Sequence, residues 1–338
     1  MEKNTLAVFD TDEGYVTKLM DYLCEAGRLP LDVQAFTKKE SLKEFMKKNP
    51  VDILLLPEDQ VDDELESAGA GEMMVLTEGT NYGTSIGKGK KSVYRYQSSE
   101  NILREVMCYY AESPVSIKSL KNDTDTSLIG VYSPLHSCLK TSFAITLGQL
   151  LSRLGKERVL YVNMESYAGF NMLLGQSFMM DLSDLLFYVG QKKKNFPCKL
   201  ASMVIKSGEL DLIPPAVSPS DLRSVSPDMW IQFFNEIMNC EYSKVIIDFG
   251  EAADGIYEVL KGCYRIYMPI KEDLVSKAKL EQYEACLRIM ECAEIMDKTE
   301  KILFPKIFKG MDARISELEK SELAQYIVSS GILRQWEN

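Results

Sequence analysis

The chain has 338 residues, of which 46% are hydrophobic and 26% charged, and its formal net charge is −11. This acidic balance argues against a broad nucleic-acid-binding face and against electrostatic binding to anionic lipid, because both need clustered lysine and arginine. No apolar stretch reaches the ~20 residues that span a bilayer, and the N-terminus is too acidic for a signal peptide, so we expect a cytoplasmic protein without a transmembrane segment.

Cysteine and histidine usage narrows the chemistry further. The single histidine excludes a His-based metal site and argues against a Ser/His/Asp triad. The eight cysteines are scattered without a CxxC pair, which is typical of reduced thiols in a cytoplasm. The length is sufficient for two domains, each with its own core.

The first third of the chain alternates short apolar runs with helical periodicity. Predicted strands cover 6–9, 31–36, 51–56, 73–76 and 92–96, and predicted helices cover 16–26, 38–49 and 99–110. Alternation of this kind predicts a parallel sheet with helices on both faces, that is, a doubly wound α/β domain.

Residues 1–112 resemble a response-regulator receiver domain in this pattern. The resemblance implies an acid after the first strand, a hydroxyl after the fourth and a basic residue after the fifth. Asp10, Thr77 and Arg95 take these places, although the neighbour of Asp10 is Thr11 where receivers have a second acid. We therefore expect Asp10 and Asp12 to be loop and cap residues rather than metal ligands.

The phosphate-accepting position of the receiver is missing. The resemblance places it at the end of the third strand, where this chain has Pro57, which carries no carboxylate. Glu58 or Asp59 is an alternative acceptor, but we favour a pseudo-receiver that acts by docking. The glycine- and lysine-rich segment 79–91 is predicted to be a flexible surface loop, and the polar segment 113–126 an inter-domain linker.

The most informative stretch runs from 127 to 148, where an apolar run, a loop and Lys140-Thr141-Ser142 precede an amphipathic helix that Gly155 ends. That is the outline of a phosphate-binding loop, in which backbone N–H groups and a helix N-terminus face the anion. The expected glycines are missing, and Leu139 stands directly before the lysine. We expect Leu139 to take the positive φ that glycine would have, at a cost of roughly 1 to 3 kcal/mol.

The rest of the chain continues the α/β pattern. Predicted strands cover 158–164, 210–213, 245–247, 265–270 and 302–308, and predicted helices cover 181–189, 227–240, 274–290 and 316–330. The helix 227–240 is predicted to bury Trp230, Phe233, Phe234, Ile237 and Met238. The fold class is therefore two doubly wound α/β domains, receiver/flavodoxin-like at 1–112 and P-loop NTPase-like at 127–338, joined by the linker 113–126.

Residues 127–338 resemble the ParA/MinD family of deviant P-loop ATPases. The landmarks occur in the family's order: the loop SPLHSCLKTS, the strand RVLYVNME, the segments LDLIPPAVSPSDL and KVIIDFG, and YRIYMPIKEDLVSKAKL. The resemblance implies a cofactor of ATP with Mg²⁺. The implied phosphate-contacting positions are Ser137, Cys138, Leu139, Lys140, Thr141 and Ser142, and the implied Mg²⁺ positions are Thr141 and Asp248.

The catalytic set that the resemblance implies is degenerate. The signature lysine falls on Leu135, the water-positioning acid falls on Asn163, and Glu165 takes the place of the second acid. The loop glycines fall on His136, Ser137 and Leu139. Because phosphoryl transfer depends on positioning and electrostatics, these losses together predict little or no hydrolysis, with ATP binding left open.

A pseudo-receiver followed by a degenerate ParA/MinD-like domain resembles the CpaE/TadZ group, which helps to place and assemble Tad (Flp) pili. The resemblance implies a scaffold or localisation factor, recruited to the inner membrane face or a cell pole, that forms a homodimer and binds the pilus motor ATPase or polar-localisation proteins. The helices around Trp230 and Phe234, or an apolar rim, would supply the dimer contact. The alternative is a slow MinD/ParA-type ATPase that cycles on a membrane.

The C-terminal segment bears on that alternative, because a MinD-type membrane anchor is a basic amphipathic helix. Here the tail is acidic overall, with a short apolar stripe formed by Ile327, Val328, Ile332, Leu333 and Trp336. We expect this stripe to pack on its own domain.

Overall fold

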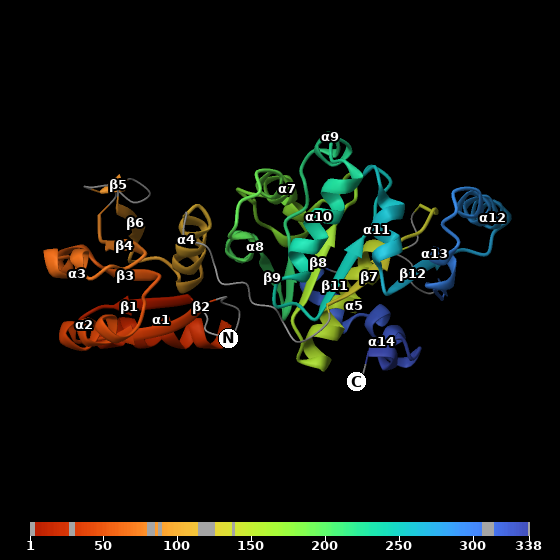
Figure 1. Ribbon diagram of the computed structural model, residues 1–338. Helices are drawn as coiled ribbons and strands as arrows, with labels where there is room; N and C mark the ends of the chain where they lie inside the picture. Colours follow the sequence, from red (N-terminus) through yellow and green to blue (C-terminus); the bar gives the residue numbers. More distant parts are fainter. Residues whose placement is uncertain are drawn as a thin grey trace. The chain divides into compact units, whose positions relative to one another are not determined.

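The computed structural model describes residues 4–26, 31–79, 85–86, 90–113, 126–136, 139–305 and 314–336. The chain forms two compact units (Figure 1). Unit 1 comprises Met1–Lys121, Lys192–Met203 and Asn239–Glu241, and unit 2 comprises the remaining residues. We keep 1–112, 113–126 and 127–338 as proposed domains, although unit 1 takes in two short segments from later in the chain.

Unit 1 is built on a six-stranded sheet in the order β2-β1-β3-β4-β6-β5. Its strands are β1 (Asn4–Phe9), β2 (Leu31–Phe36), β3 (Ile53–Pro57), β4 (Glu72–Thr77), β5 (Ser85–Ile86) and β6 (Lys90–Tyr94). All neighbouring pairs are parallel except β5 on β6. The five parallel strands β2-β1-β3-β4-β6 confirm the predicted parallel sheet, and their order is one of the common doubly wound orders.

The helices of unit 1 are α1 (Glu13–Ala26), α2 (Lys39–Lys48), α3 (Asp63–Ser67), α4 (Ser99–Ala111) and α8 (Phe196–Met203), with a 3₁₀ turn η1 at Glu58–Gln60. The prediction missed α3 and α8. At the start of α8, the buried Asn195 amide donates to the carbonyls of Tyr110 (3.1 Å) and Ser113 (3.2 Å) at the end of α4. Part of the predicted loop 79–91 forms β5 and the start of β6, and residues 80–84 and 87–89 lie outside the described residues.

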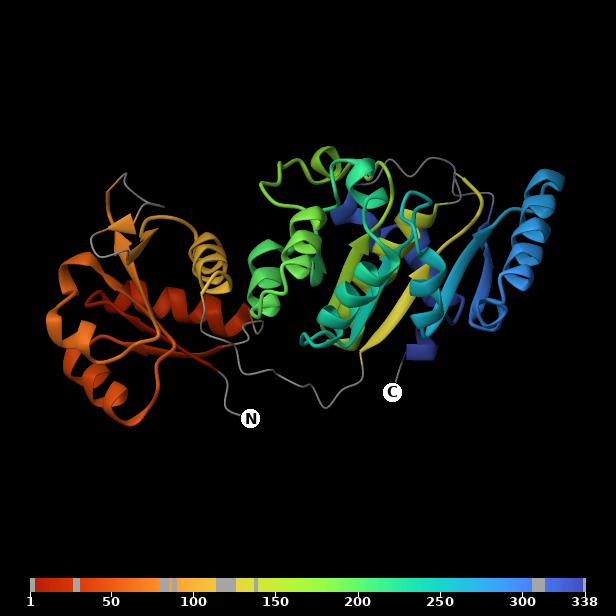
Figure 2. The same cartoon turned by 45° about the horizontal axis from the view of Figure 1, so that its top comes forward.

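Unit 2 contains a seven-stranded sheet in the order β13-β12-β7-β11-β8-β10-β9 (Figures 1 and 2). Its strands are β7 (Ser127–Val131), β8 (Val159–Asn163), β9 (Ile205–Ser207), β10 (Leu210–Leu212), β11 (Lys244–Asp248), β12 (Arg265–Ile270) and β13 (Thr299–Leu303). Only the β9–β10 pair is antiparallel among the described pairs. The predicted last strand, 302–308, was placed about three residues too late.

The helical elements of unit 2 are α5 (Lys140–Gly155), α6 (Phe170–Leu174), α7 (Leu182–Gly190), α9 (Pro219–Arg223), α10 (Pro227–Met238), α11 (Ile256–Gly262), α12 (Leu274–Ile289), α13 (Glu294–Asp297), η2 (Ile315–Lys320), α14 (Glu322–Ser329) and η3 (Leu333–Trp336). The helix predicted at 316–330 is in fact divided into the 3₁₀ turn η2 and α14. No described helix has the length and apolarity to cross a membrane.

Helix α5 lies at the centre of unit 2, because every side chain from Phe143 to Ser152 is buried. Gly148 allows this position, since a Cβ there would come within 2.9 Å of the Leu210 side chain and 3.1 Å of Ile246. The opposite side of α5 is covered by η2 and α14. The helix end differs in detail from the prediction: Gly155 is the last helical residue, but Lys156 takes the left-handed conformation that follows it.

The C-terminal stripe packs on unit 2, as predicted. Ile327, Ile332 and Leu333 are buried in the same cluster as α5. The Trp336 indole nitrogen donates to the Tyr267 hydroxyl at 2.9 Å. Val328 departs from the prediction, because 51% of its surface is exposed. Most of this stripe is therefore buried in the core of unit 2 and does not form an exposed membrane anchor.

The aromatic face of α10 is also in the core. Trp230, Phe233, Phe234 and Ile237 are buried, as predicted, whereas Met238 at the helix end is 36% exposed and not buried. Because Trp230 and Phe234 pack inside unit 2, their side chains cannot supply a dimer contact.

Candidate functional site

The loop that the sequence predicts to bind phosphate begins where β7 ends, at the carboxyl edge of the unit 2 sheet. The Ser133 hydroxyl donates to the Pro269 carbonyl (2.7 Å) and accepts from the Leu135 amide (3.2 Å). The Lys271 ammonium donates to the His136 carbonyl at 2.9 Å. These contacts fix the first half of the loop against β12 and the segment that follows it.

Leu139 adopts φ 60° and ψ 23°, which confirms the predicted left-handed conformation. It is the N-cap of α5, but its side chain makes no capping hydrogen bond. A leucine in this conformation is strained, because its Cβ crowds the following carbonyl. The chain has kept the backbone geometry that a glycine would give and carries a bulky side chain there.

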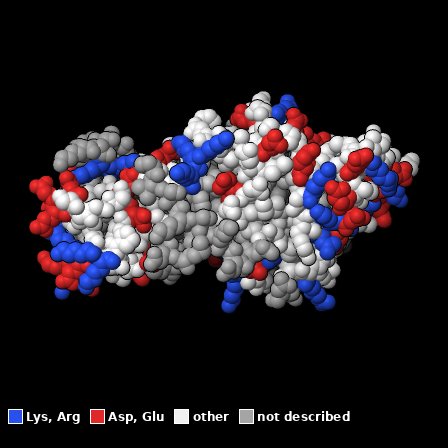
Figure 3. All heavy atoms as spheres, in the orientation of Figure 1, with Lys and Arg blue, Asp and Glu red and all other residues white. Residues whose placement is uncertain are grey.

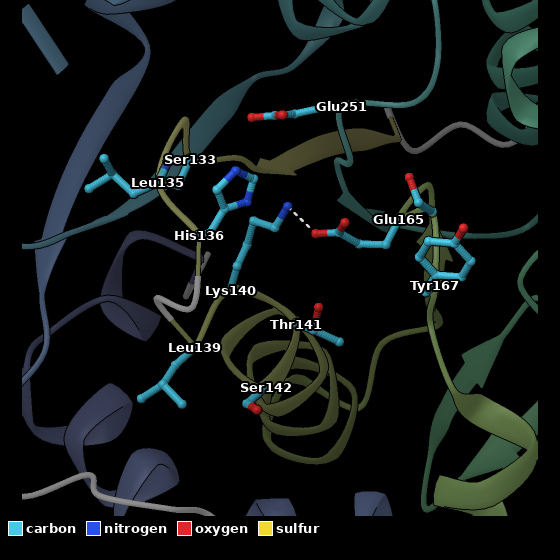
Figure 4. Close-up of a pocket in the computed structure, with 11 residues that line it drawn as sticks. Ser133, Leu135, His136, Leu139, Lys140, Thr141, Ser142, Glu165, Tyr167 and Glu251 are labelled. Atoms are coloured by element: carbon cyan, nitrogen blue, oxygen red, sulfur yellow. Dashed lines mark hydrogen bonds and ion pairs between the residues drawn. The ribbon is translucent and has the colours of Figure 1, made fainter. Parts of the chain in front are cut away.

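Lys140, the first residue of α5, is surrounded by acceptors from its own unit. Its ammonium forms an ion pair with the Glu165 carboxylate (Figure 4). It also donates to the Phe249 carbonyl. The nitrogen also lies 3.8 Å from Asp248 Oδ1. The Lys140 side chain is only 12% exposed, so its positive charge is balanced inside the protein.

Asp248, the last residue of β11, is completely buried. Its Oδ2 accepts from the Tyr161 hydroxyl at 3.0 Å and from the Asn163 amide at 3.3 Å. Burial raises the pKa of Asp248 to about 6, although Lys140 and the Thr141 hydroxyl act in the opposite direction. Glu165 adds to the increase in pKa because it is a second negative charge nearby.

Asn163 lies beneath the candidate site and does not line it. Only 1% of the residue is exposed. Its amide nitrogen donates to the Tyr161 hydroxyl (2.8 Å), and its carbonyl oxygen accepts from the Glu165 backbone amide (2.9 Å). Asn163 therefore connects β8 to β11 and orients Glu165.

Gly250 is a site-forming residue that the sequence reasoning missed. A Cβ at this position would lie 2.4 Å from the Met164 carbonyl oxygen and 2.7 Å from the Glu165 Cα. The segment after β11 can therefore pass directly over the segment after β8 only because residue 250 is glycine. This close approach brings the Phe249 carbonyl and Glu165 to the same lysine.

A cavity of about 570 Å³ opens above these groups. Four predicted positions line it, namely Leu139, Lys140, Thr141 and Ser142, together with Glu165 (Figure 4). The lining also contains Ser133, Leu135, His136, Ser166, Tyr167 and Glu251. Two further predicted residues, Ser137 and Cys138, lie outside the described residues. Leu135, where the sequence resemblance places the signature lysine, is buried and apolar.

The residues present suit Mg²⁺ better than they suit a phosphate. The Thr141 hydroxyl lies beside the Asp248 carboxylate, and hydroxyl and carboxylate oxygens are the hard ligands that Mg²⁺ prefers. Within the described part of the chain, no group of three or more His, Cys, Asp and Glu side chains could hold a metal. Such an ion would need further oxygens from a nucleotide, and the lysine for that nucleotide is engaged with Glu165.

The carboxyl edge of unit 1 has a comparable arrangement around Arg95. One guanidinium nitrogen lies 3.0 Å from Asp10 Oδ2 and 3.8 Å from Asp12 Oδ2, and another lies 3.0 Å from Glu78 Oε1. Burial raises the pKa of Asp10, while the backbone hydrogen bond from Asp12 and the charge of Arg95 oppose the increase.

Both acids after β1 have partners within the described part of unit 1. Asp10 is paired with Arg95, and Asp12 accepts from the Tyr15 amide (3.1 Å) at the start of α1, as predicted for a cap. Pro57 is buried at the end of β3.

No known family pattern matches the chain, and no curated protein does. Among solved structures, it is similar to a ParA-family ATPase from Chlorobium tepidum, with 21% identity and a TM-score of 0.46 over 58% of this chain and 80% of that one. It is also similar to the MinC:MinD cell division complex of Aquifex aeolicus (18%, TM-score 0.39, 53% and 68%).

A third similar structure is a putative plasmid partition protein from Borrelia burgdorferi bound to AMPPNP (15%, TM-score 0.43, 61% and 100%). The likeness in all three concerns the α/β fold.

Proposed function

We propose that the chain is a scaffold protein of the CpaE/TadZ type, in which a P-loop ATPase fold serves for docking and hydrolyses little or no ATP. The observation that carries the proposal is the position of the Lys140 ammonium, between Glu165, Asp248 and the Phe249 carbonyl. In a working phosphate loop this charge contacts the outer phosphates.

The charges around the cavity oppose an anion. Lys140 is its one lining cation among the described residues, whereas Glu165 and Glu251 line the same cavity and Asp248 lies beneath it. A triphosphate would therefore have to displace Glu165 from Lys140 and tolerate nearby carboxylates in a partly water-excluded site.

Hydrolysis lacks two further contributions. Leu135 provides no cation for the transition-state charge, a contact worth on the order of 10³-fold or more in related phosphoryl transfer. Asn163 is neutral, buried and directed at Asp248 and Tyr161, so it does not position an attacking water. These losses affect the same reaction step, so turnover is expected at background.

The test combines a nucleotide-binding titration with a phosphate-release assay, both with Mg²⁺. We expect wild type and Lys140→Ala to give the same background rate of phosphate release. Lys301→Ala is the matched control, because it removes a lysine from a surface ion pair with Glu284. Measurable turnover by wild type that Lys140→Ala abolishes would contradict the scaffold proposal and establish an ATPase.

The second candidate function is a slow MinD/ParA-type ATPase, and one observation favours it. The Thr141 hydroxyl, Asp248 and a cavity of about 570 Å³ are all retained, which is what Mg-nucleotide would need. Binding would then be coupled to a rearrangement of Glu165. Unchanged resistance of the chain to proteolysis on addition of Mg-ATP would count against this second function.

The partners follow from the same proposal. We propose a cytoplasmic homodimer that binds the pilus motor ATPase through unit 2 and a polar-localisation protein through unit 1, at the inner membrane face or a cell pole. The support is the sequence resemblance together with two sheet edges whose charges are internally paired. Binding of the purified motor ATPase to wild type and to Lys140→Ala with equal affinity is the expected result. Binding that requires Mg-ATP would contradict it.

A further inference from the structure

Helix α12 has a second face that the fold of unit 2 leaves uncovered. The helix connects β12 to β13 and lies at the edge of the unit, beside α13 (Figures 1 and 2). Its buried residues are Ser276, Leu280, Tyr283 and Leu287. These follow one another at spacings of four, three and four, so they form one narrow stripe towards the core.

The opposite face carries a second stripe with heptad spacing. It consists of Val275, Ala278, Gln282, Ala285 and Ile289, all exposed. Val275 is 65% exposed and Ile289 is 81% exposed, and Leu274 beside them is 82% exposed. Spacings of three, four, three and four place such residues along one seam, as in the contact line of paired helices. The two alanines in the middle would let a second helix approach closely.

We propose that this seam binds the same seam of a second copy of the chain, with the two α12 helices antiparallel. The flanking charges favour this occupant. Glu281 and Arg288 lie on the same side of the seam. Arg288 lies 3.6 Å from Glu284 of its own helix, a pair that is more than half exposed at the arginine, whereas no ion pair between described residues includes Glu281. In the register that sets Gln282 against the partner's Ala285, Glu281 faces the partner's Arg288, and the pair occurs twice by symmetry.

A parallel pair would be less favourable. It would stack Gln282 on the partner's Gln282 and place Glu281 beside the partner's Cys286, so the opposite charges would not meet. In Figure 3, basic and acidic atoms are intermixed over the end of unit 2 where α12 lies, so no single-sign field opposes self-association there. A 16-residue helix is about 24 Å long, so the contact is small and the dimer should depend on concentration.

This seam is independent of the candidate site, because no residue of α12 lines the cavity. Its test therefore differs from the test of the proposed function. Sedimentation equilibrium over a range of concentrations, with and without Mg-ATP, should show a dimer of wild type in both cases. Ala285→Glu and Ile289→Glu should each weaken the dimer at least tenfold.

The matched control is Val328→Glu, which adds a charge at an exposed apolar position on α14. It should leave the dimer constant unchanged, and circular dichroism should show all variants folded. If Ala285→Glu and Ile289→Glu associate as tightly as wild type, or if wild type stays monomeric, the proposal is wrong. Ile289→Glu and wild type should release phosphate at the same rate. A weaker dimer of Ile289→Glu would then reflect the seam and not a change in ATPase activity.

Cross-linking determines the orientation. In a Cys286→Ser background, Ala278→Cys mixed with Ile289→Cys should form disulfide-linked heterodimers, because these positions face each other in the antiparallel register. Neither variant should link to itself efficiently, since its two copies would lie about 16 Å apart along the seam. Self-linking of each variant alone would show a parallel pair and overturn the proposed arrangement. The absence of any link above the Cys286→Ser baseline would overturn the interface.

Discussion

The carboxyl edges of the two sheets each hold a cation that is paired with nearby acids, but their surroundings differ. In unit 1, Arg95 pairs with Asp10 and Glu78, and Pro57 is buried at the end of β3. In unit 2, Lys140 pairs with Glu165 beside a cavity of about 570 Å³, and Thr141 and Asp248 are retained. The acids of unit 1 are therefore paired with a largely buried arginine, whereas in unit 2 a glutamate pairs with the lysine that lines a cavity.

The largest expected effect comes from removing either central cation. Lys140→Met leaves Asp248 buried without its counter-charge, and Arg95→Met does the same to Asp10. Loss of one partner of a buried ion pair costs about 3 kcal/mol in the free energy of unfolding. Urea denaturation of both variants is the measurement.

Exposed ion pairs provide the controls for this comparison. Lys301→Met breaks a pair with Glu284 whose side chains are 48% and 26% exposed, and it should cost less than about 1 kcal/mol. If Lys140→Met is as mild as Lys301→Met, the Lys140 cluster does not stabilise the fold, and the two edges are not comparable.

The second effect is a pH dependence specific to unit 2. The folded pKa of Asp248 is about 6, above its ordinary value of 3.8, so the folded state binds the proton more tightly. The free energy of unfolding should then fall by roughly 3 kcal/mol as the pH rises from below 4 to above 6. In Asp248→Asn this decrease should be absent, because an amide does not titrate. Lys140, Glu165 and Tyr161 still surround the side chain at position 248 in this variant. Parallel pH profiles of the two proteins in urea would show that Asp248 is not the group concerned.

Glu165→Gln tests directly whether the unit 2 site is occupied by its own side chain. The amide keeps the size of the side chain and removes the charge that holds Lys140. We expect Mg-ATP to bind at least tenfold more tightly than to wild type, which corresponds to about 1.4 kcal/mol. Glu251→Gln is the control, because it removes a carboxylate from the same cavity without freeing Lys140. Equal affinities of the two variants would show that net charge, and not the Lys140–Glu165 pair, controls binding.

The sequence was sufficient to predict the parts of the fold that depend on local pattern. Most of the parallel strands, most of the buried face of α10 and the left-handed Leu139 follow from periodicity and from a motif that fixes backbone shape, whereas the short strands β5 and β9 were not predicted. Short helices such as α3 and α8 were missed because each contributes too few turns to show a periodicity. The strand β13 was misplaced because its residues carry alternating charge and only Ile302 is buried.

The site was predictable as a set of positions but not as a set of contacts. The pairing of Lys140 with Glu165 depends on Gly250, which lies 85 residues after Glu165 and lets the segments after β8 and β11 pass in contact. That Asn163 would turn away from the cavity depends on Tyr161 and Asp248, its neighbours in the folded sheet. The sequence signal for the close approach at Gly250 was a glycine directly after an Asp-Phe pair. The orientation of Asn163 has no signal in the neighbouring sequence.

The smallest expected effect concerns the strain at the two ends of α5. Leu139 and Lys156 flank the helix with φ values of 60° and 52°, and both are positions where glycine relieves crowding. Lys156→Gly should raise the free energy of unfolding by up to about 1 kcal/mol, because the relief exceeds the entropy that glycine adds to the unfolded chain. Leu139→Gly should change it by less, since the side chain that lines the cavity is lost as well.

The two variants also distinguish the effect of backbone conformation from the effect of charge at the loop before α5. If the loop is inactive because Lys140 is engaged, Leu139→Gly will bind Mg-ATP no better than Lys156→Gly does. If Leu139→Gly alone restores binding or phosphate release, the missing glycine is the decisive defect, and the comparison between the two sheet edges must be rebuilt on backbone geometry.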